Sequence, residues 1–440
     1  MSFTPIPSDP FTRRLQKIGE LITNGDIPNA ALGLNEVAGQ QPKDPRVYLL
    51  GMRLSEAKGE PDRAETDVRR AVSLNPMWIV SVTELAALLS RLGRHEEAMQ
   101  HAKKAASLEP HNIDMLKRVI DIAHSALKFQ DALGWLKRLS DLQPADMNLK
   151  LLIANDLRFV GNDAEALVVY DDLLAANPNE PVALLRRVQL LWALGRVDLA
   201  AKDSDLLRVR YAGNAEVQLW HGLTHGETLL TLPVEMVRSI FDAEAGQYNA
   251  RRLRQMNYRL PEVMAALIKA KYPSMDIDLL ELGSGTGLLG AALGKRQGAL
   301  VGVDISLKMV EQAAPLELYD RVHTIDLLDA LRATPDALYP VIAACDAFSY
   351  VGDLGQAIPD ALRILLPDGH FVFSCELAGE DEADLVLRPT LRFAHKRSHI
   401  EALCHAAGFD RVEVTETTLF NDLQDRAVQG FAVVAHKPAV

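Results

Sequence analysis

The residues with the clearest chemical purpose form a glycine-rich turn, Gly283-Ser284-Gly285-Thr286-Gly287, which follows an apolar run ending in Glu281 and Leu282. Glycine adopts positive φ easily and lets the backbone approach a ligand closely. A helix predicted to begin near Leu288 would add unpaired N–H groups at its N-terminus. By itself the turn indicates only that a phosphate or a nucleoside docks there.

Acidic residues end the apolar runs that follow the turn. Asp304 stands 21 residues after Gly283, where its carboxylate can accept hydrogen bonds from both hydroxyls of a ribose. Asp326 ends the third run, where it can meet the edge of an adenine, and Asp346 ends the fourth. Because the C-terminal ends of parallel strands meet at one edge of a sheet, we expect these residues to share one site.

The elements that must position these residues are strands alternating with helices. From about residue 275, apolar runs of strand length are each followed by an amphipathic stretch, which predicts a Rossmann-like α/β domain with helices on both faces of the sheet. The last two runs, separated only by a loop, predict an antiparallel pair. The seven predicted strands are 278–283, 299–304, 322–326, 341–346, 370–376, 411–419 and 430–435.

The N-terminal half is predicted to be an all-α repeat array, because three series of residues recur every 34 positions. Alanines fit where paired helices approach closely, glycines end helices in a left-handed conformation, and prolines cannot continue a helix. Segments such as LGRHEEAMQHAKKAASLEP resemble the tetratricopeptide repeat (TPR), which implies a superhelical solenoid. The series are Pro42, Pro76, Pro110, Pro144 and Pro178; Ala30, Ala64, Ala98, Ala132, Ala166 and Ala200; and Gly25, Gly59, Gly93, Gly161 and Gly195, the last series broken once by Leu127.

The patterns divide the chain into five segments. We expect an N-terminal tail at 1–10, about six repeats at 11–214, a capping helix and linker at 215–234, lid helices at 235–274 and a catalytic domain at 275–440. The solenoid is expected to bind a protein or peptide, although oligomerisation and a pure scaffold role stay open.

The C-terminal half resembles the class I methyltransferases that use S-adenosylmethionine (SAM). The motifs that carry the resemblance occur in the family's order: LLELGSGTGLLG, VGVDIS, TIDLLD, ACDAFSYVGDL and LLPDGHFVFSCE. Together with the lead-in FDAEAGQYNARRLRQMNYRLPEVM, the chain resembles bacterial TPR-containing methyltransferases. The resemblance implies SAM as cofactor and a binding set of Glu281, Gly283, Ser284, Gly285, Gly287, Asp304, Ile305, Asp326, Leu327 and Asp346.

Two other interpretations compete with an active methyltransferase. A nicotinamide dehydrogenase usually carries Gly-x-Gly-x-x-Gly, whereas the last position here is Leu288, and an antiparallel end suits a methyltransferase better. A catalytically inactive domain that only binds SAM is the other alternative.

Candidate substrate residues surround the predicted cofactor edge. Phe241, Tyr248 and Tyr258 would line a lid or pack it against the sheet, and Tyr350 follows the fourth strand. His395 is predicted on an exposed loop at the ligand edge, where a neutral imidazole could act as the base. Arg392, in the same predicted loop, is a candidate contact for an anionic group of the substrate.

Composition and motifs narrow the substrate. The chain has 440 residues and a net charge of −12, and residues 235–440 carry 29 acidic against 20 basic side chains, which argues against a nucleic-acid substrate. The fourth-strand motif lacks the Asn-Pro-Pro-Tyr sequence of enzymes that methylate adenine amines or glutamine amides. Asp346 and Glu376 are the only obvious acidic pair at the ligand edge, so no metal is expected.

The remaining predictions concern compartment and acceptor. Three cysteines without metal-ligand spacing, no signal peptide and no long apolar stretch predict a cytoplasmic protein that does not enter a membrane. The acceptor is predicted to be a protein or peptide presented by the solenoid. The alternatives are a small molecule of a biosynthetic pathway, with the solenoid binding a partner, and a scaffold that senses SAM without catalysis.

Overall fold

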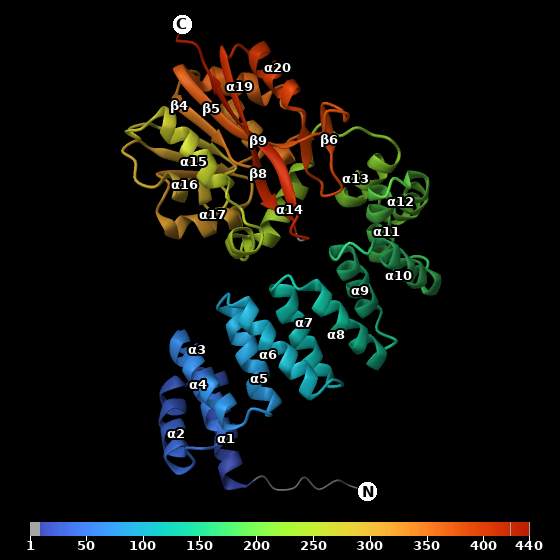
Figure 1. Cartoon of the computed structure of the whole chain (residues 1–440), viewed down its shortest axis with the longest axis vertical. Helices are drawn as coiled ribbons and strands as arrows, with labels where there is room; N and C mark the ends of the chain where they lie inside the picture. Colours follow the sequence, from blue (N-terminus) through green and yellow to red (C-terminus); the bar gives the residue numbers. More distant parts are fainter. Residues whose placement is uncertain (1–8, 423, 440) are drawn as a thin grey trace. The chain divides into compact units, whose positions relative to one another are not determined.

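The computed structural model describes residues 9–422 and 424–439 (Figure 1). Residues 1–8 of the predicted tail therefore lie outside the described residues. The chain divides into two compact units, 1–173 and 174–440, so the last repeat helices group with the C-terminal domain. The five segment boundaries drawn from the sequence stay predictions.

The described N-terminal residues form helices of 13 to 15 residues in consecutive pairs, followed by one shorter helix, α13. The TPR solenoid is thus confirmed as the fold of this part. The helices are α1 (Pro10–Thr23), α2 (Ile27–Gln40), α3 (Pro45–Ala57), α4 (Pro61–Leu74), α5 (Ile79–Arg91), α6 (His95–Leu108), α7 (Ile113–Ser125), α8 (Phe129–Leu142), α9 (Met147–Phe159), α10 (Asp163–Ala176), α11 (Pro181–Ala193), α12 (Val197–Tyr211) and α13 (Ala215–Thr224).

The repeated residues occupy the positions that their physical chemistry requires. All six alanines of the series are completely buried, which lets the second helix of each pair approach the first closely. All five glycines of the series have φ between 71° and 80°, a conformation that costs other residues free energy. Leu127, the exception in that series, still adopts φ 53°, so the helix spacing is kept there despite the missing glycine.

The C-terminal domain is built on one twisted sheet. Its strands run in the order β3-β2-β1-β4-β5-β7-β6, and β9 pairs antiparallel with both β5 and β8. The strands are β1 (Leu279–Leu282), β2 (Leu300–Asp304), β3 (Arg321–Thr324), β4 (Tyr339–Ala344), β5 (Leu365–Leu377), β6 (Leu385–Leu387), β7 (Phe393–His395), β8 (Arg411–Asn421) and β9 (Ala427–His436).

Helices cover both faces of this sheet, as expected for a Rossmann-like domain. Alternate residues along each central strand face opposite layers: Leu280 and Leu282 of β1 pack with α18 (Leu327–Ala333), α19 (Ala357–Ile364) and α20 (Arg397–Ala407). Leu279 instead packs with α15 (Leu260–Lys271) and α16 (Leu288–Leu293). This period of two places each strand between two apolar layers.

The prediction of seven strands is wrong in number. All seven predicted runs form strands, but β6 and β7 add a hairpin in the segment that was predicted to be a loop. The residues of β7, Phe393-Ala394-His395, are too few to produce an alternating pattern, and their pairing with β5 comes only from tertiary contacts.

Ahead of the sheet lie α14 (Val234–Glu244), a π-helical turn at Ala250–Gln255 and α15, in the segment predicted to be a lid. Within residues 9–422 and 424–439, no helix is both long enough and apolar enough to cross a membrane.

The repeat glycines give a test of the array. At Gly59 an added Cβ meets nothing, so Gly59→Ala should destabilise the protein by about 1 kcal/mol through its positive φ alone. Gly134 lies inside α8 and also has open space around it, so Gly134→Ala should stabilise the protein by about 0.5–1 kcal/mol. Urea unfolding would measure both changes. Effects of the same sign would contradict the conformational explanation.

Candidate active site

The glycine turn connects β1 to α16 with three residues in the left-handed region. Gly283, Gly285 and Gly287 have φ of 70°, 54° and 88°, and Gly287 caps the N-terminus of α16. At Gly283 a Cβ would also lie 2.8 Å from the Cβ of Ala347, which follows β4. A side chain at Gly283 would therefore both strain the turn and push the ends of β1 and β4 apart.

Asp304, the last residue of β2, ties this turn to the neighbouring strand. Its Oδ2 accepts a hydrogen bond from the Gly285 N–H and its Oδ1 accepts one from the Ser306 N–H, each at 2.8 Å. Burial raises the pKa of the Asp304 carboxyl above its ordinary value, while the two backbone N–H groups act in the opposite direction. The carboxylate thus lies fixed beside the turn.

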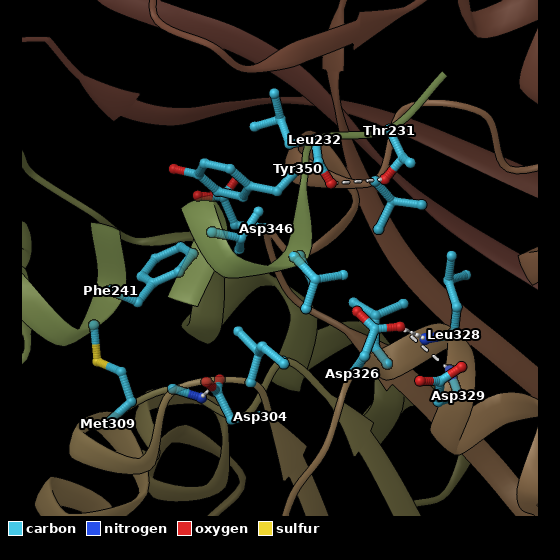
Figure 2. A pocket seen from close by; sticks show the side chains of 18 of the residues that line it. Thr231, Leu232, Phe241, Asp304, Met309, Asp326, Leu328, Asp329, Asp346 and Tyr350 are labelled. Atoms are coloured by element: carbon cyan, nitrogen blue, oxygen red, sulfur yellow. Dashed lines mark hydrogen bonds between the residues drawn. The ribbon is translucent and has the colours of Figure 1, made fainter. Parts of the chain in front are cut away.

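These residues line a pocket of about 250 Å³ at the edge where the strands end (Figure 2). Ten of the residues predicted from the sequence lie on its wall. They are Gly283, Gly285, Asp304, Ile305, Asp326, Leu327, Asp346, Phe241, Tyr248 and Tyr350.

Asp326 and Asp346 both line the pocket, but different elements hold them in place. Asp326 caps α18, because its Oδ1 accepts hydrogen bonds from the N–H groups of Leu328 at 2.9 Å and Asp329 at 3.3 Å (Figure 2). Asp346 follows β4 with φ 59°, and its backbone N–H donates a hydrogen bond to the Oγ of Ser374 at 2.9 Å.

An adjoining smaller pocket contains Glu281, Ser284 and Tyr258, and it shares Gly283 and Gly285 with the first. Burial raises the pKa of Glu281 to about 8, although the hydroxyl of Tyr319 donates to its Oε2 at 2.9 Å. The Oγ of Ser284 is buried and has no hydrogen-bond partner in the described part of the chain. These groups are available to a polar ligand that enters beside the turn.

The aromatic residues of the lid divide between the two roles considered for them. Phe241 packs edge-on against Tyr350 with ring centroids 5.0 Å apart, and both rings face the pocket (Figure 2). Tyr258 is buried in the core, and the guanidinium of Arg252 lies 5.6 Å from its ring and 5.2 Å from that of Tyr248. Tyr258 therefore packs the lid against the sheet.

Polar contacts also hold the lid to the strand ends. The hydroxyl of Ser306 donates to Asp242 of α14 at 2.6 Å, and the hydroxyl of Thr286 donates to the side-chain oxygen of Asn249. The segment 242–249 is thus hydrogen-bonded both to the glycine turn and to the residues after β2.

Arg392 lies behind the pocket wall and does not line it. Its guanidinium donates to Asp346 Oδ1 at 2.6 Å and to Glu376 Oε2 at 2.7 Å, and both ion pairs are buried. It also packs over the rings of Tyr350 and Phe420. The guanidinium is thus occupied by two carboxylates of the protein itself. Arg392 holds Asp346 in place and compensates its charge.

The predicted environment of His395 is wrong. This residue belongs to β7, is 1% exposed and is absent from the pocket wall. Its Nε2–H donates to the carbonyl oxygen of Gly352 at 2.6 Å, and burial lowers its pKa to about 4. The sequence predicts an exposed loop here because the strand that contains His395 has three residues, too few to give an alternating apolar pattern.

Sequence reasoning missed several residues of the pocket wall. Thr231 and Leu232 come from the linker before α14, and Met309 comes from the helix after β2. Asp329 comes from the first turn of α18 and Arg332 from its last turn, and the two side chains pair at 2.7 Å. Only the position of α18 directly after Asp326 could have indicated any of them.

The ion pair behind the pocket can be tested by substitution. Arg392→Met should lower the free energy of unfolding by about 3–5 kcal/mol, because it leaves the buried carboxylate of Asp346 without an ion-pair partner and leaves Glu376 only the more distant Arg388, at 3.8 Å. Arg397→Met, which removes an exposed arginine paired with Glu401, is the matched control and should leave the stability unchanged. If denaturant unfolding shows the same loss of free energy of unfolding for both variants, the buried ion pairs contribute no more stability than the exposed one.

Comparisons with known proteins agree with this geometry. Residues 280–371 match the model of a methyltransferase domain, and residues 81–112 match that of a tetratricopeptide repeat. The chain is 31% identical over 147 residues to a malonyl-[acyl-carrier protein] O-methyltransferase of Methylovorus sp. (strain MP688), a match that covers 31% of this chain and 49% of that protein. It is 34% identical over 148 residues to a biotin biosynthesis bifunctional protein of Bordetella avium (strain 197N), covering 32% of this chain and 30% of that protein.

The chain thus spans half or less of the length of these curated relatives. Among solved structures it is similar to a Burkholderia thailandensis 1,6-didemethyltoxoflavin-N1-methyltransferase, with 17% identity, coverage of 48% of this chain and 92% of that one, and a TM-score of 0.38. A Haemonchus contortus N-methyltransferase has 16% identity, coverage of 40% and 52%, and a TM-score of 0.34. The chain thus carries a tetratricopeptide repeat within an array of paired helices, followed by a domain whose residues 280–371 match a methyltransferase domain.

Proposed function

We propose that the C-terminal domain transfers the methyl group of SAM to an acceptor that reaches the pocket beneath α14. The observation that carries the proposal is the convergence of the glycine turn, Asp304 and Asp326 on one pocket at the strand ends. When bound, SAM supplies a methyl group already activated by its sulfonium. The protein then has to bind, orient and exclude water, which a lidded pocket can do.

Each part of the cofactor has partners on this wall. Asp304 would accept hydrogen bonds from the ribose hydroxyls, with Ile305 beside it, and Asp326 and Leu327 would contact the adenine. The amino-acid end would lie toward the adjoining pocket, where the unpartnered Oγ of Ser284 and the carboxyl of Glu281 can bind its charged groups. Gly283 and Gly285 keep this path free of side chains.

The acceptor is proposed to be an ionised carboxylate on a protein or peptide. The described residues that line the pocket include neither histidine nor lysine, and its carboxylates Asp304, Asp326 and Asp346 accept hydrogen bonds from backbone N–H groups or from Arg392. An acceptor that is already ionised, and needs no base in the site, therefore suits the pocket. The relative from Methylovorus is named as an O-methyltransferase of a malonyl group, which carries such a carboxylate. In the N-terminal unit, a groove of about 720 Å³ between α1, α3 and α5 contains Arg46, Arg53 and Trp78 and supports the binding of a partner.

The cofactor assignment predicts the effect of one substitution. Asp304→Asn should weaken SAM binding about tenfold or more, because it replaces charge-assisted hydrogen bonds to the ribose. Titration calorimetry with SAM would measure the change, and circular dichroism would confirm the fold. Asp381→Asn, at an exposed aspartate outside the pocket, should bind like the unchanged protein. Failure of the unchanged protein to bind SAM would overturn the proposed function.

The acceptor is tested by labelling a lysate from a strain that lacks the protein, using methyl-labelled SAM. We expect label in the macromolecular fraction that mild alkali releases as volatile methanol, since esters hydrolyse and methylated amines do not. Asp304→Asn serves as the low-activity control. Label only in small molecules would favour the alternative, in which the repeats bind a partner or form oligomers, and alkali-stable label would contradict a carboxylate acceptor.

A further inference from the structure

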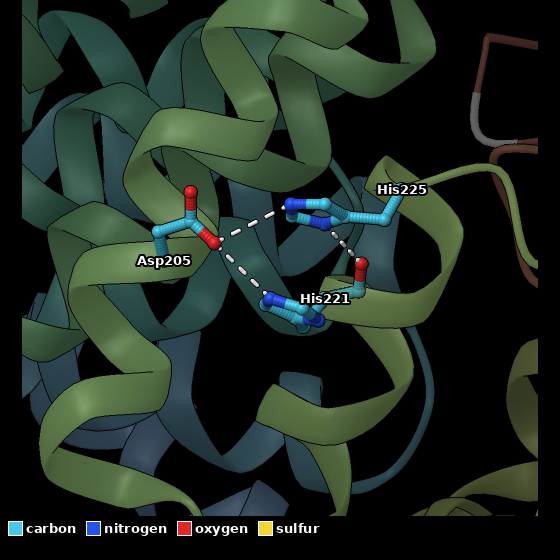
Figure 3. A group of neighbouring side chains, drawn as sticks. All are labelled: Asp205, His221 and His225. Carbon is cyan, nitrogen blue, oxygen red and sulfur yellow. Dashed lines mark hydrogen bonds and ion pairs between the residues drawn. The ribbon is translucent and has the colours of Figure 1, made fainter.

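A second group of reactive side chains lies outside the methyltransferase pocket, where α12 packs against α13 (Figure 3). Asp205 belongs to α12, His221 belongs to α13 and His225 caps the C-terminus of α13. One carboxylate oxygen and one nitrogen from each ring lie within 4.8 Å of one another. Oδ1 of Asp205 is 3.1 Å from Nε2 of His221 and 3.4 Å from Nε2 of His225.

The two histidines are arranged as a chelating pair. They stand four residues apart, which places them on one face of the helix, and their rings stack with centroids 4.0 Å apart. Nδ1–H of His225 donates to the carbonyl oxygen of His221 at 2.8 Å, so its Nε2 carries the free lone pair (Figure 3). Histidines that bind metals usually have their other ring nitrogen held by such a carbonyl.

We propose that Asp205, His221 and His225 bind one divalent transition-metal ion, with Zn²⁺ as the best match. Two imidazoles and a carboxylate are ligands that Zn²⁺ prefers, and three protein ligands leave the fourth tetrahedral position to water. The Asp205 and His225 side chains are 58% and 39% exposed, so an ion and its water can enter from solvent. This departs from the prediction that the chain holds no metal.

The alternative is that Asp205 forms ion pairs with the two histidine rings and no metal binds. The position of Arg208 favours this alternative. Nη1 of Arg208 lies 3.1 Å from Nδ1 of His221 and 3.2 Å from Nε2, where it competes with a metal for the ring. Arg208 is exposed and can turn away into solvent. Small rotations of the three side chains would then bring their ligand atoms to the ~2.0–2.2 Å that Zn²⁺ requires.

A metal here would join α12 to α13 directly before the linker to the methyltransferase domain. In that linker the carbonyl oxygen of Leu230 accepts a hydrogen bond from the Asp353 N–H at 2.7 Å, and Thr231 and Leu232 line the cofactor pocket. The ion would therefore fix the end of α13 from which these pocket residues extend.

The test is titration of the full-length, tag-free protein with Zn²⁺ alone, followed by calorimetry and by thermal unfolding with and without a chelator. We expect one Zn²⁺ per chain and a higher Tm that the chelator reverses. Asp205→Asn, His221→Gln and His225→Gln should each weaken binding about tenfold or more, because each removes one of three ligands. Arg208→Gln should bind at least as tightly as the unchanged protein.

His405→Gln is the matched control. His405 lies near the end of α20 and its Nδ1 contacts the carbonyl oxygen of Phe409 at 3.1 Å, much as His225 contacts His221, so its loss should leave Zn²⁺ binding unchanged. If the ligand variants lose their fold, ring-nitrogen NMR of the unchanged protein should show two histidines shifting with one equivalent of Zn²⁺. The proposal fails if the unchanged protein binds no Zn²⁺ at submillimolar concentration, if binding survives in the histidine variants, or if His405→Gln abolishes it.

Discussion

The carboxylate of Asp304 holds together the edge of the sheet on which the proposed function depends. It ends β2, yet it accepts hydrogen bonds from the turn after β1 and from the start of the segment after β2. It adds to the backbone hydrogen bonds that the N–H groups of Gly283 and Ser284 donate to the carbonyl oxygen of Val303 in β2. A buried carboxylate is costly to desolvate, and the two backbone N–H groups supply the compensation. The same oxygens are then already oriented for a ligand.

Buried charge recurs behind the pocket, where Arg392 compensates Asp346 and Glu376 together. Asp346 is also held by the hydroxyl of Ser349, which donates to its Oδ1 at 3.3 Å, and by its own N–H, which donates to Ser374. Arg392 thus acts on the pocket through Asp346, while His395, three residues further on, is a buried part of the strand. The sequence predicts His395 as the base and Arg392 as an anion contact. Both are buried away from the pocket wall, on which Phe241 and Tyr350 pack edge-on against each other.

In the repeat array, too, a few residue types at fixed positions determine the geometry. Completely buried alanines set how closely paired helices approach, and left-handed residues set where each first helix ends. Leu127 keeps the left-handed conformation without being glycine, which indicates that helix packing dominates the local preference at that turn. The Asp205, His221 and His225 cluster lies where this regular packing ends, at the capping helix.

The sequence alone was sufficient for the repeat period, the Rossmann-like alternation of strands and helices, and ten residues of the pocket wall. These features depend on local rules: Gly283 and Gly285 need positive φ, and Asp304, Asp326 and Asp346 stand at the ends of apolar runs. Only the tertiary structure decided that β6 and β7 extend the sheet, that Arg392 and His395 are buried, and that Thr231 and Met309 reach the pocket. It also brought Asp205 beside a histidine pair 16 and 20 residues away. The physical reason is that strand pairing and burial of short segments come from contacts between residues distant in the chain, which leave no periodic pattern in the sequence.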